Sequence, residues 1–214
     1  MKIEVWSDYV CPFCYIGKRR LEEALESTGL KDTAEVVFKA YELDPNSPRT
    51  SEEPKTEMLV KKYGMGLEEA EAMIKNIGQI AESVGLNYDL DNMKPANTFD
   101  AHRLAKLAEQ EGLGAEVSES LLKAYFVEAK KIGTHDALLT VAEEAGISRD
   151  RVKEMLDSNE FAEDVKADVA EAVKIGVQGV PFFVINRKYA ISGAQPTETF
   201  AEALNKAAAE EVGN

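Results

Sequence analysis

The two cysteines of this 214-residue chain stand within four residues of each other, in the stretch SDYVCPFCYIGKRR. Residues 2–6 alternate polar and apolar side chains, which predicts a short strand just before this stretch. From Pro12 onward apolar residues recur at helical spacing, and Gly29 stands where such a helix would end. The order strand, turn, helix therefore predicts Cys11 at a helix N-terminus and Cys14 about one turn further on.

This placement suits thiol chemistry. The thiolate is the form of cysteine that attacks a disulfide, and the unpaired N–H groups and dipole of a helix N-terminus stabilise an anion. Pro12, at a first helical position, is pre-set for this geometry. We expect Cys11 to be the exposed nucleophile and Cys14 to lie beneath it, placed to resolve the mixed disulfide that Cys11 forms.

The two intervening residues, Pro12 and Phe13, are predicted to contribute to the substrate-binding surface and to tune the pair. Neither offers a charged or hydrogen-bonding side chain to a thiolate. We therefore expect a reduction potential between that of thioredoxin, about −270 mV, and that of the strongest oxidants of this kind, about −120 mV.

Composition excludes several other classes. A net charge of −14 argues against nucleic acid and anionic membranes as partners, because a phosphate surface requires a basic face opposite it. No apolar run approaches the length of a membrane span, and Glu4 and Asp8 stand where a secretory signal would be apolar, so we expect a cytoplasmic protein. Two cysteines are too few for a disulfide framework. A zinc site would need His102 and His135, which lack metal-finger spacing, so no metal is predicted.

Strand patterns occur near both ends of the chain, and helical patterns lie between them. A second strand is predicted within residues 34–43, and strands flanking Asn186 and Arg187 predict a hairpin. Helices are predicted at residues 67–84, 97–111, 117–130, 135–145, 161–174 and 197–210. We infer one α/β domain, residues 1–55 and 157–214, interrupted by a helical domain at residues 56–156.

Four stretches of this chain resemble the DsbA branch of the thioredoxin superfamily, and within it the FrnE-like group. They are SDYVCPFCYIGKRRLEEAL, NTFDAHRLAKLA, AYFVEAKKIG and GVQGVPFFVINRKYAISGAQPTETF, which begin at residues 7, 97, 124 and 176. The resemblance implies a thioredoxin-like fold with a helical domain inserted after the second strand. It also implies a redox-active dithiol that needs no cofactor, with glutathione as a possible co-substrate, and a monomer or homodimer that acts on thiol- or disulfide-bearing polypeptides or on glutathione.

The resemblance further implies a cis-proline loop that faces the cysteines. GVP supplies this loop at Val180 and Pro181, and in the family the backbone of the residue before the proline pairs with bound peptide. An ordinary strand-initiating proline is the alternative for Pro181. The chain departs from the group at Phe13, where tryptophan is common, which leaves substrate preference and potential open.

Several other residues have two interpretations. His102 is a candidate substrate-binding residue near the thiolate, but we favour a histidine hydrogen-bonded within the helical bundle. For Trp6, Tyr9 and Tyr15 we favour core packing over a groove for unfolded chains. For Met58, Met65 and Met73 we favour ordinary packing over an adaptable surface for peptides.

Three functions follow from these patterns. The first is a thiol-disulfide oxidoreductase that uses the CPFC motif. The second is a glutathione-dependent isomerase or transferase of the kappa or 2-hydroxychromene-2-carboxylate isomerase type, which needs no resolving cysteine, so that Cys14 argues against it. The third is a non-catalytic peptide-binding module in which the dithiol is incidental.

Overall fold

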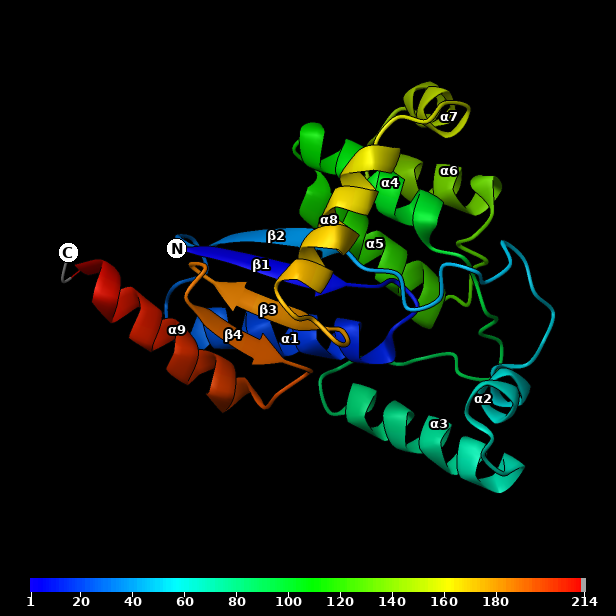
Figure 1. Cartoon of the computed structure of the whole chain (residues 1–214), viewed down its shortest axis with the longest axis horizontal. Helices are drawn as coiled ribbons and strands as arrows, with labels where there is room; N and C mark the ends of the chain where they lie inside the picture. The colour runs from blue at the N-terminus through cyan, green and yellow to red at the C-terminus, as the bar shows by residue number, and fades with distance from the viewer. Residues whose placement is uncertain (213–214) are drawn as a thin grey trace.

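A four-stranded mixed sheet forms the centre of the computed structural model, which describes residues 1–212 (Figure 1). The strands lie in the order β2-β1-β3-β4: β1 pairs with β2 in parallel and with β3 antiparallel, and β3 and β4 form an antiparallel hairpin. Their bounds are Lys2–Ser7 (β1), Glu35–Ala40 (β2), Phe182–Ile185 (β3) and Tyr189–Ser192 (β4). Asn186 and Arg187 form the two-residue hairpin turn with φ of 51° and 56°, as the sequence predicts.

Alternation along β1 assigns its side chains to two cores. Ile3 and Val5 pack with Phe183 of β3 and Phe200 against helices α1 (Pro12–Ser27) and α9 (Thr197–Val212). Trp6 points to the opposite face, where it packs with residues around helix α8 (Ala162–Lys174). The sheet is therefore covered by helices on both faces, which explains why β1 is buried along nearly its whole length.

In the sequence, the remaining helices lie between β2 and α8. They are α2 (Lys55–Tyr63), α3 (Leu67–Glu82), α4 (Phe99–Gln110), α5 (Gly114–Phe126), α6 (His135–Glu144) and α7 (Arg149–Leu156). Helices α4 to α7 share one hydrophobic core, whereas α2 and α3 pack on each other and extend away from that bundle (Figure 1). Within residues 1–212 no helix has both the length and the apolar character needed to span a membrane.

The predicted elements agree with the observed ones except in three places. The helix predicted at residues 117–130 ends at Phe126, because the chain turns and Ala129 adopts a φ of 48° that a helix does not allow. Helices α2 and α7 are short and were not separately predicted. The predicted boundaries of the inserted helical domain, at residues 56 and 156, stay a prediction.

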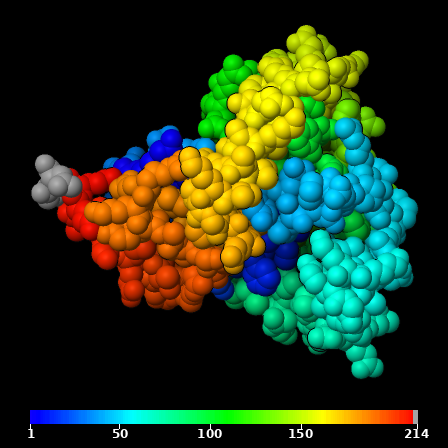
Figure 2. All heavy atoms as spheres, in the orientation of Figure 1, coloured from blue at the N-terminus to red at the C-terminus, as the bar shows by residue number. Residues whose placement is uncertain are grey.

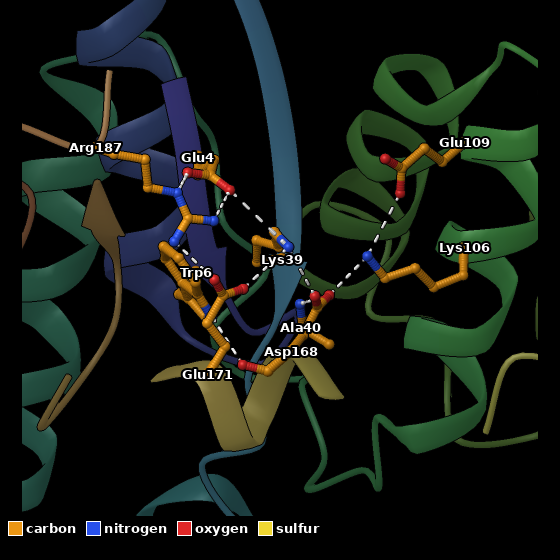
Figure 3. A network of polar contacts seen from close by, with 9 residues as sticks. All are labelled: Glu4, Trp6, Lys39, Ala40, Lys106, Glu109, Asp168, Glu171 and Arg187. Atoms are coloured by element: carbon orange, nitrogen blue, oxygen red, sulfur yellow. Dashed lines mark hydrogen bonds and ion pairs between the residues drawn. The ribbon is translucent and has the colours of Figure 1, made fainter. Parts of the chain in front are cut away.

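A buried carboxylate holds α8 to the sheet and to α4. Figure 3 shows Asp168 of α8 between two lysines: its oxygens lie 3.1 Å from Lys39 Nζ and 2.6 Å from Lys106 Nζ. Asp168 also accepts the backbone N–H of Ala40 at 2.9 Å, and its own carbonyl accepts the indole N–H of Trp6 at 3.0 Å. One side chain thus connects α8, β2 and α4.

Replacing Asp168 with alanine should lower the free energy of unfolding by about 3 kcal/mol, because it leaves two poorly solvated ammonium groups and a buried N–H without their shared partner. Asp164→Ala, on the exposed side of the same helix, should cost less than about 1 kcal/mol. Urea unfolding of both variants at neutral pH checks this; equal losses would contradict a central role for Asp168.

Candidate active site around Cys11 and Cys14

Cys11 caps the N-terminus of α1 and Pro12 is the first residue of that helix. The backbone of Cys11 is extended, with φ −89° and ψ 113°, and its carbonyl accepts the N–H of Cys14 at 3.0 Å. The pair therefore occupies the first turn, as the sequence predicts, and both residues are free thiols in this structure.

The Cys11 sulfur faces the loop before β3. Its thiol donates to the carbonyl oxygen of Val180 at 3.4 Å, and the Val180–Pro181 peptide bond is cis. Gly17, one turn further along α1 than Cys14, leaves room for the Val180–Pro181 loop to lie against the helix. A Cβ atom there would lie 3.0 Å from Pro181 Cγ and 3.1 Å from a ring carbon of Phe183.

The expectation that Cys11 is exposed is wrong. Only 4% of the residue is accessible, because the Val180–Pro181 loop and the side chains around α2 and α3 cover it. Cys11 instead borders a cavity of about 510 Å³, together with Pro12 and Phe13. Phe13, which also lines this cavity, is 38% exposed.

Apolar side chains form most of the cavity wall. They come from α2, α3, the neighbouring loops and the end of α5, and include Met58, Leu59, Met65, Met73, Ile74, Ile77, Leu90, Met93 and Phe126. Our preference for ordinary packing of Met58, Met65 and Met73 is therefore corrected: all three line the cavity that opens on Cys11. The reason is the position of the α2–α3 pair, which lies apart from the α4–α7 core. Figure 2 shows this pair, in cyan and green-blue, beside the dark-blue N-terminal segment.

Cys14 lies behind Cys11 and is almost fully buried, with 3% of the residue accessible. Its sulfur accepts the backbone N–H of Asp8 at 3.4 Å. Burial raises the pKa of the Cys14 thiol well above its ordinary value, and the hydrogen bond with the Cys11 thiol raises it further. Cys14 is therefore held as a protonated thiol while Cys11 is reduced.

Asp8 forms a buried polar cluster beneath the pair, which the sequence analysis did not identify. One carboxylate oxygen accepts the N–H of Leu43 at 2.7 Å, and the other lies 3.3 Å from Nε2 of His102. The same nitrogen lies 3.0 Å from the carbonyl of Tyr41. Because both neighbours are acceptors, Nε2 carries a proton and donates to them.

This cluster locates the predicted substrate-binding histidine. His102 packs against the ring of Tyr9, with centroids 4.9 Å apart, and is 3% exposed. It is absent from the cavity lining, and within the described residues its polar contacts are to Asp8 and Tyr41. The structure thus places His102 in the bundle, where Asp8 lies between it and the cysteine pair. Trp6, Tyr9 and Tyr15 are buried, which confirms their prediction as core residues.

Three further residues complete the surroundings of the motif: Tyr88, Lys55 and Lys62. Tyr88 donates its hydroxyl to the carbonyl of Pro12 at 2.8 Å and stacks on Phe126 with ring centroids 4.6 Å apart. Lys55 and Lys62 also line the cavity. No sequence signal marked these residues, because each stands in a segment with ordinary surface composition. Within residues 1–212 no group of three or more His, Cys, Asp or Glu side chains is placed to hold a metal ion.

Helix α5 is fixed to the cysteine-bearing helix through Glu119. The carboxylate of Glu119 accepts hydrogen bonds from the Tyr15 hydroxyl at 2.6 Å, from Lys18 at 2.5 Å and from Arg19 at 3.0 Å. Burial opposes ionisation of this carboxyl, but the hydrogen bond from Arg19 and the charge of Lys18 outweigh it and lower the pKa of Glu119 to about 2.

A carboxyl whose pKa is lower in the folded state than in the unfolded state stabilises the fold at high pH and loses that effect as pH falls. Glu119→Gln should therefore lower the free energy of unfolding by about 1 to 2 kcal/mol at pH 7, a value reduced by partial solvent exposure. The difference from the unaltered protein should shrink as pH falls from about 5 toward 2. Urea titrations at several pH values measure it.

Glu116→Gln provides the control for this prediction. Glu116 lies on the same helix, is exposed, and forms no ion pair within residues 1–212. Its replacement should change stability little at any pH. A constant difference for Glu119→Gln across the titration would contradict the linkage.

Comparison with known proteins agrees with this geometry. The family model for the DsbA-like thioredoxin domain matches residues 2–205. The protein YwbO of Bacillus subtilis is 30% identical over 205 residues, which cover 95% of each chain. A solved structure described as a probable DsbA oxidoreductase from Streptomyces coelicolor is 38% identical, with a TM-score of 0.93 over 98% of this chain and 91% of that one.

A more distant structure shares the fold alone. A 2-hydroxychromene-2-carboxylate isomerase is 18% identical, with a TM-score of 0.72 over 99% of this chain and 98% of that one. The architecture is therefore a thioredoxin-like α/β fold of the kind the sequence resemblance implied. The same overall fold carries more than one chemistry, so the choice of reaction depends on the site.

Proposed function

Because the chain belongs to the family of DsbA-like thioredoxin domains, we propose that it is a thiol-disulfide oxidoreductase that acts through Cys11 and Cys14. One observation carries this proposal. Cys11 lies at a helix N-terminus and lines a cavity of the size of small-molecule sites. Cys14 lies directly behind it in the same helical turn.

The first step uses Cys11. Cys11, at the N-terminus of α1, attacks one sulfur of a substrate disulfide in its thiolate form. A new S–S bond joins Cys11 to that sulfur, and the other substrate sulfur leaves as a thiolate that takes up a proton. The Val180 carbonyl, which accepts the Cys11 thiol in the reduced protein, loses this hydrogen bond when the proton departs.

The second step uses Cys14. Its thiol gives up its proton, attacks the Cys11 sulfur and releases the second substrate thiol, so that the protein is oxidised and the substrate is reduced by two electrons. The backbone N–H of Asp8, which already points at the Cys14 sulfur, stabilises the thiolate formed in this step. Burial delays that ionisation until the mixed disulfide is in place.

We assign the substrate surface to residues around the mouth of the cavity. Pro12 and Phe13 line it, and the half-buried Val180 offers backbone next to Cys11, where the family resemblance implies pairing with a bound peptide. The partners proposed are disulfide- or thiol-bearing polypeptides or glutathione, with no cofactor beyond the dithiol. We propose a cytoplasmic location, where a reducing thiol pool would regenerate the dithiol and drive the reduction of substrates.

The largely apolar cavity beside a nucleophile also fits a glutathione-dependent isomerase. Such an enzyme activates one thiol and needs no second cysteine. It would keep its activity in Cys14→Ser, whereas the proposed oxidoreductase would not. A passive peptide-binding module would keep its affinity for partners even in Cys11→Ser.

Equilibration of the protein with glutathione buffers should give a two-electron midpoint between about −270 and −120 mV, measured by mass-tagged alkylation of Cys11 and Cys14. Cys14→Ser should accumulate a mixed disulfide on Cys11, because the resolving thiol is absent. Cys11→Ser should form no adduct and should reduce substrate disulfides no faster than the uncatalysed background.

Two results would count against the proposal. If no reversible disulfide forms between the cysteines, the redox assignment fails. If Cys14→Ser instead isomerises a small substrate in the presence of glutathione at the unaltered rate, the isomerase assignment replaces it.

A further inference from the structure

Among the charged residues that line the cavity, Lys55 differs from Asp44 and Lys62 because it forms no ion pair within residues 1–212. It is the first residue of α2, it lines the cavity together with Cys11, and its ammonium group donates to the Tyr125 hydroxyl at 3.4 Å. The ion pairs of residues 1–212 do not include it. Lys62, on the same helix and the same cavity, is by contrast paired with Asp44 at 3.4 Å.

The environment of Lys55 is unfavourable to a cation without an anionic partner. Burial, and after it the positive charge of Lys62, lower the pKa of Lys55 to about 8, although Asp8 and Cys11 act in the opposite direction. The ammonium is still mostly protonated at pH 7. The chain has 39 acidic residues against 25 lysines and arginines, so carboxylates are not scarce, and yet within residues 1–212 none pairs with this group.

We propose that Lys55 binds a carboxylate of the substrate, and that the substrate is a low-molecular-mass disulfide with an apolar body and an acidic group. This deepens the proposed function and rests on it. A cavity of about 510 Å³ has the size of small-molecule sites, and its walls are mostly apolar, so the disulfide would reach Cys11 while the acidic group faces Lys55. The carboxylate of the substrate would then be the anionic partner of Lys55 that residues 1–212 do not provide.

The reaction with such a substrate balances without another reagent. The Cys11 thiolate attacks the disulfide and releases one small thiolate, and the Cys14 thiolate then releases the second and closes the Cys11–Cys14 disulfide. Two small thiols are formed for each protein dithiol oxidised, and two protons pass from the cysteines to them or to solvent.

The test compares two aromatic disulfides of similar shape and different charge: dithiobis(nitrobenzoate), which carries carboxylates, and dithiodipyridine, which is neutral at pH 7.5. Each is mixed with the reduced protein, and thiol release is followed in a single turnover. The quantity measured is the ratio of the two second-order rate constants. A change in the thiolate fraction of Cys11 affects both substrates and cancels in this ratio.

Lys55→Met should lower the ratio of anionic to neutral rate constants about tenfold, and Lys55→Arg should hold it within about threefold of the unaltered protein. Lys62→Met is the matched control, because it removes one positive charge from the same cavity at a residue that is already paired. Its ratio should change less than about twofold. The thermal midpoint of Lys55→Met should not fall, since the substitution removes a poorly solvated charge.

An unchanged ratio in Lys55→Met, or an equal decrease in Lys62→Met, would overturn the carboxylate subsite. In that case both disulfides would still be reduced with release of two thiols, and the proposed oxidoreductase would stand. If neither disulfide releases two thiols from the unaltered protein, the proposed function fails and the subsite fails with it.

Discussion

The contact between the N-terminus of α1 and the Val180–Pro181 loop is the constraint on which the rest of the site depends. Cys11 occupies the helix cap, its sulfur meets the Val180 carbonyl, and Gly17 admits the proline ring where any larger residue would collide with it. A glycine inside a helix weakens that helix by about 0.5 to 1 kcal/mol relative to alanine. Here the missing side chain permits two segments about 165 residues apart to meet.

That contact also decides how the two thiols differ. With the loop on one side and the cavity on the other, Cys11 borders a space lined largely by α2 and α3, whereas Cys14 is enclosed by protein and keeps its proton. The difference between two identical side chains three positions apart comes entirely from their surroundings. Buried polar residues support it from beneath: Asp8 receives hydrogen bonds from Leu43 and His102 and turns its own backbone N–H toward the Cys14 sulfur.

The elements closest to the motif were the most predictable from sequence. Strand β1, the start of α1 and the β3–β4 hairpin depend on local patterns: alternation, Pro12 after Cys11, and the turn at Asn186 and Arg187. The burial of Cys11 was not predictable in this way, because the atoms that cover it belong to segments well over a hundred residues away or to the α2–α3 pair. The same holds for the methionines of that pair, whose spacing along a helix is compatible with either a core or a cavity wall.

Local patterns in the sequence were enough to predict two thiols in one helical turn, with a strand before them and a helix after them, because interactions between near neighbours in the chain set these features. The tertiary structure alone decided access and charge. It brought Val180 to Cys11, made a cavity from α2 and α3, placed His102 in the bundle and left Lys55 facing that cavity without a carboxylate. These features depend on which distant segments pack together, and a local pattern of residues does not contain that information.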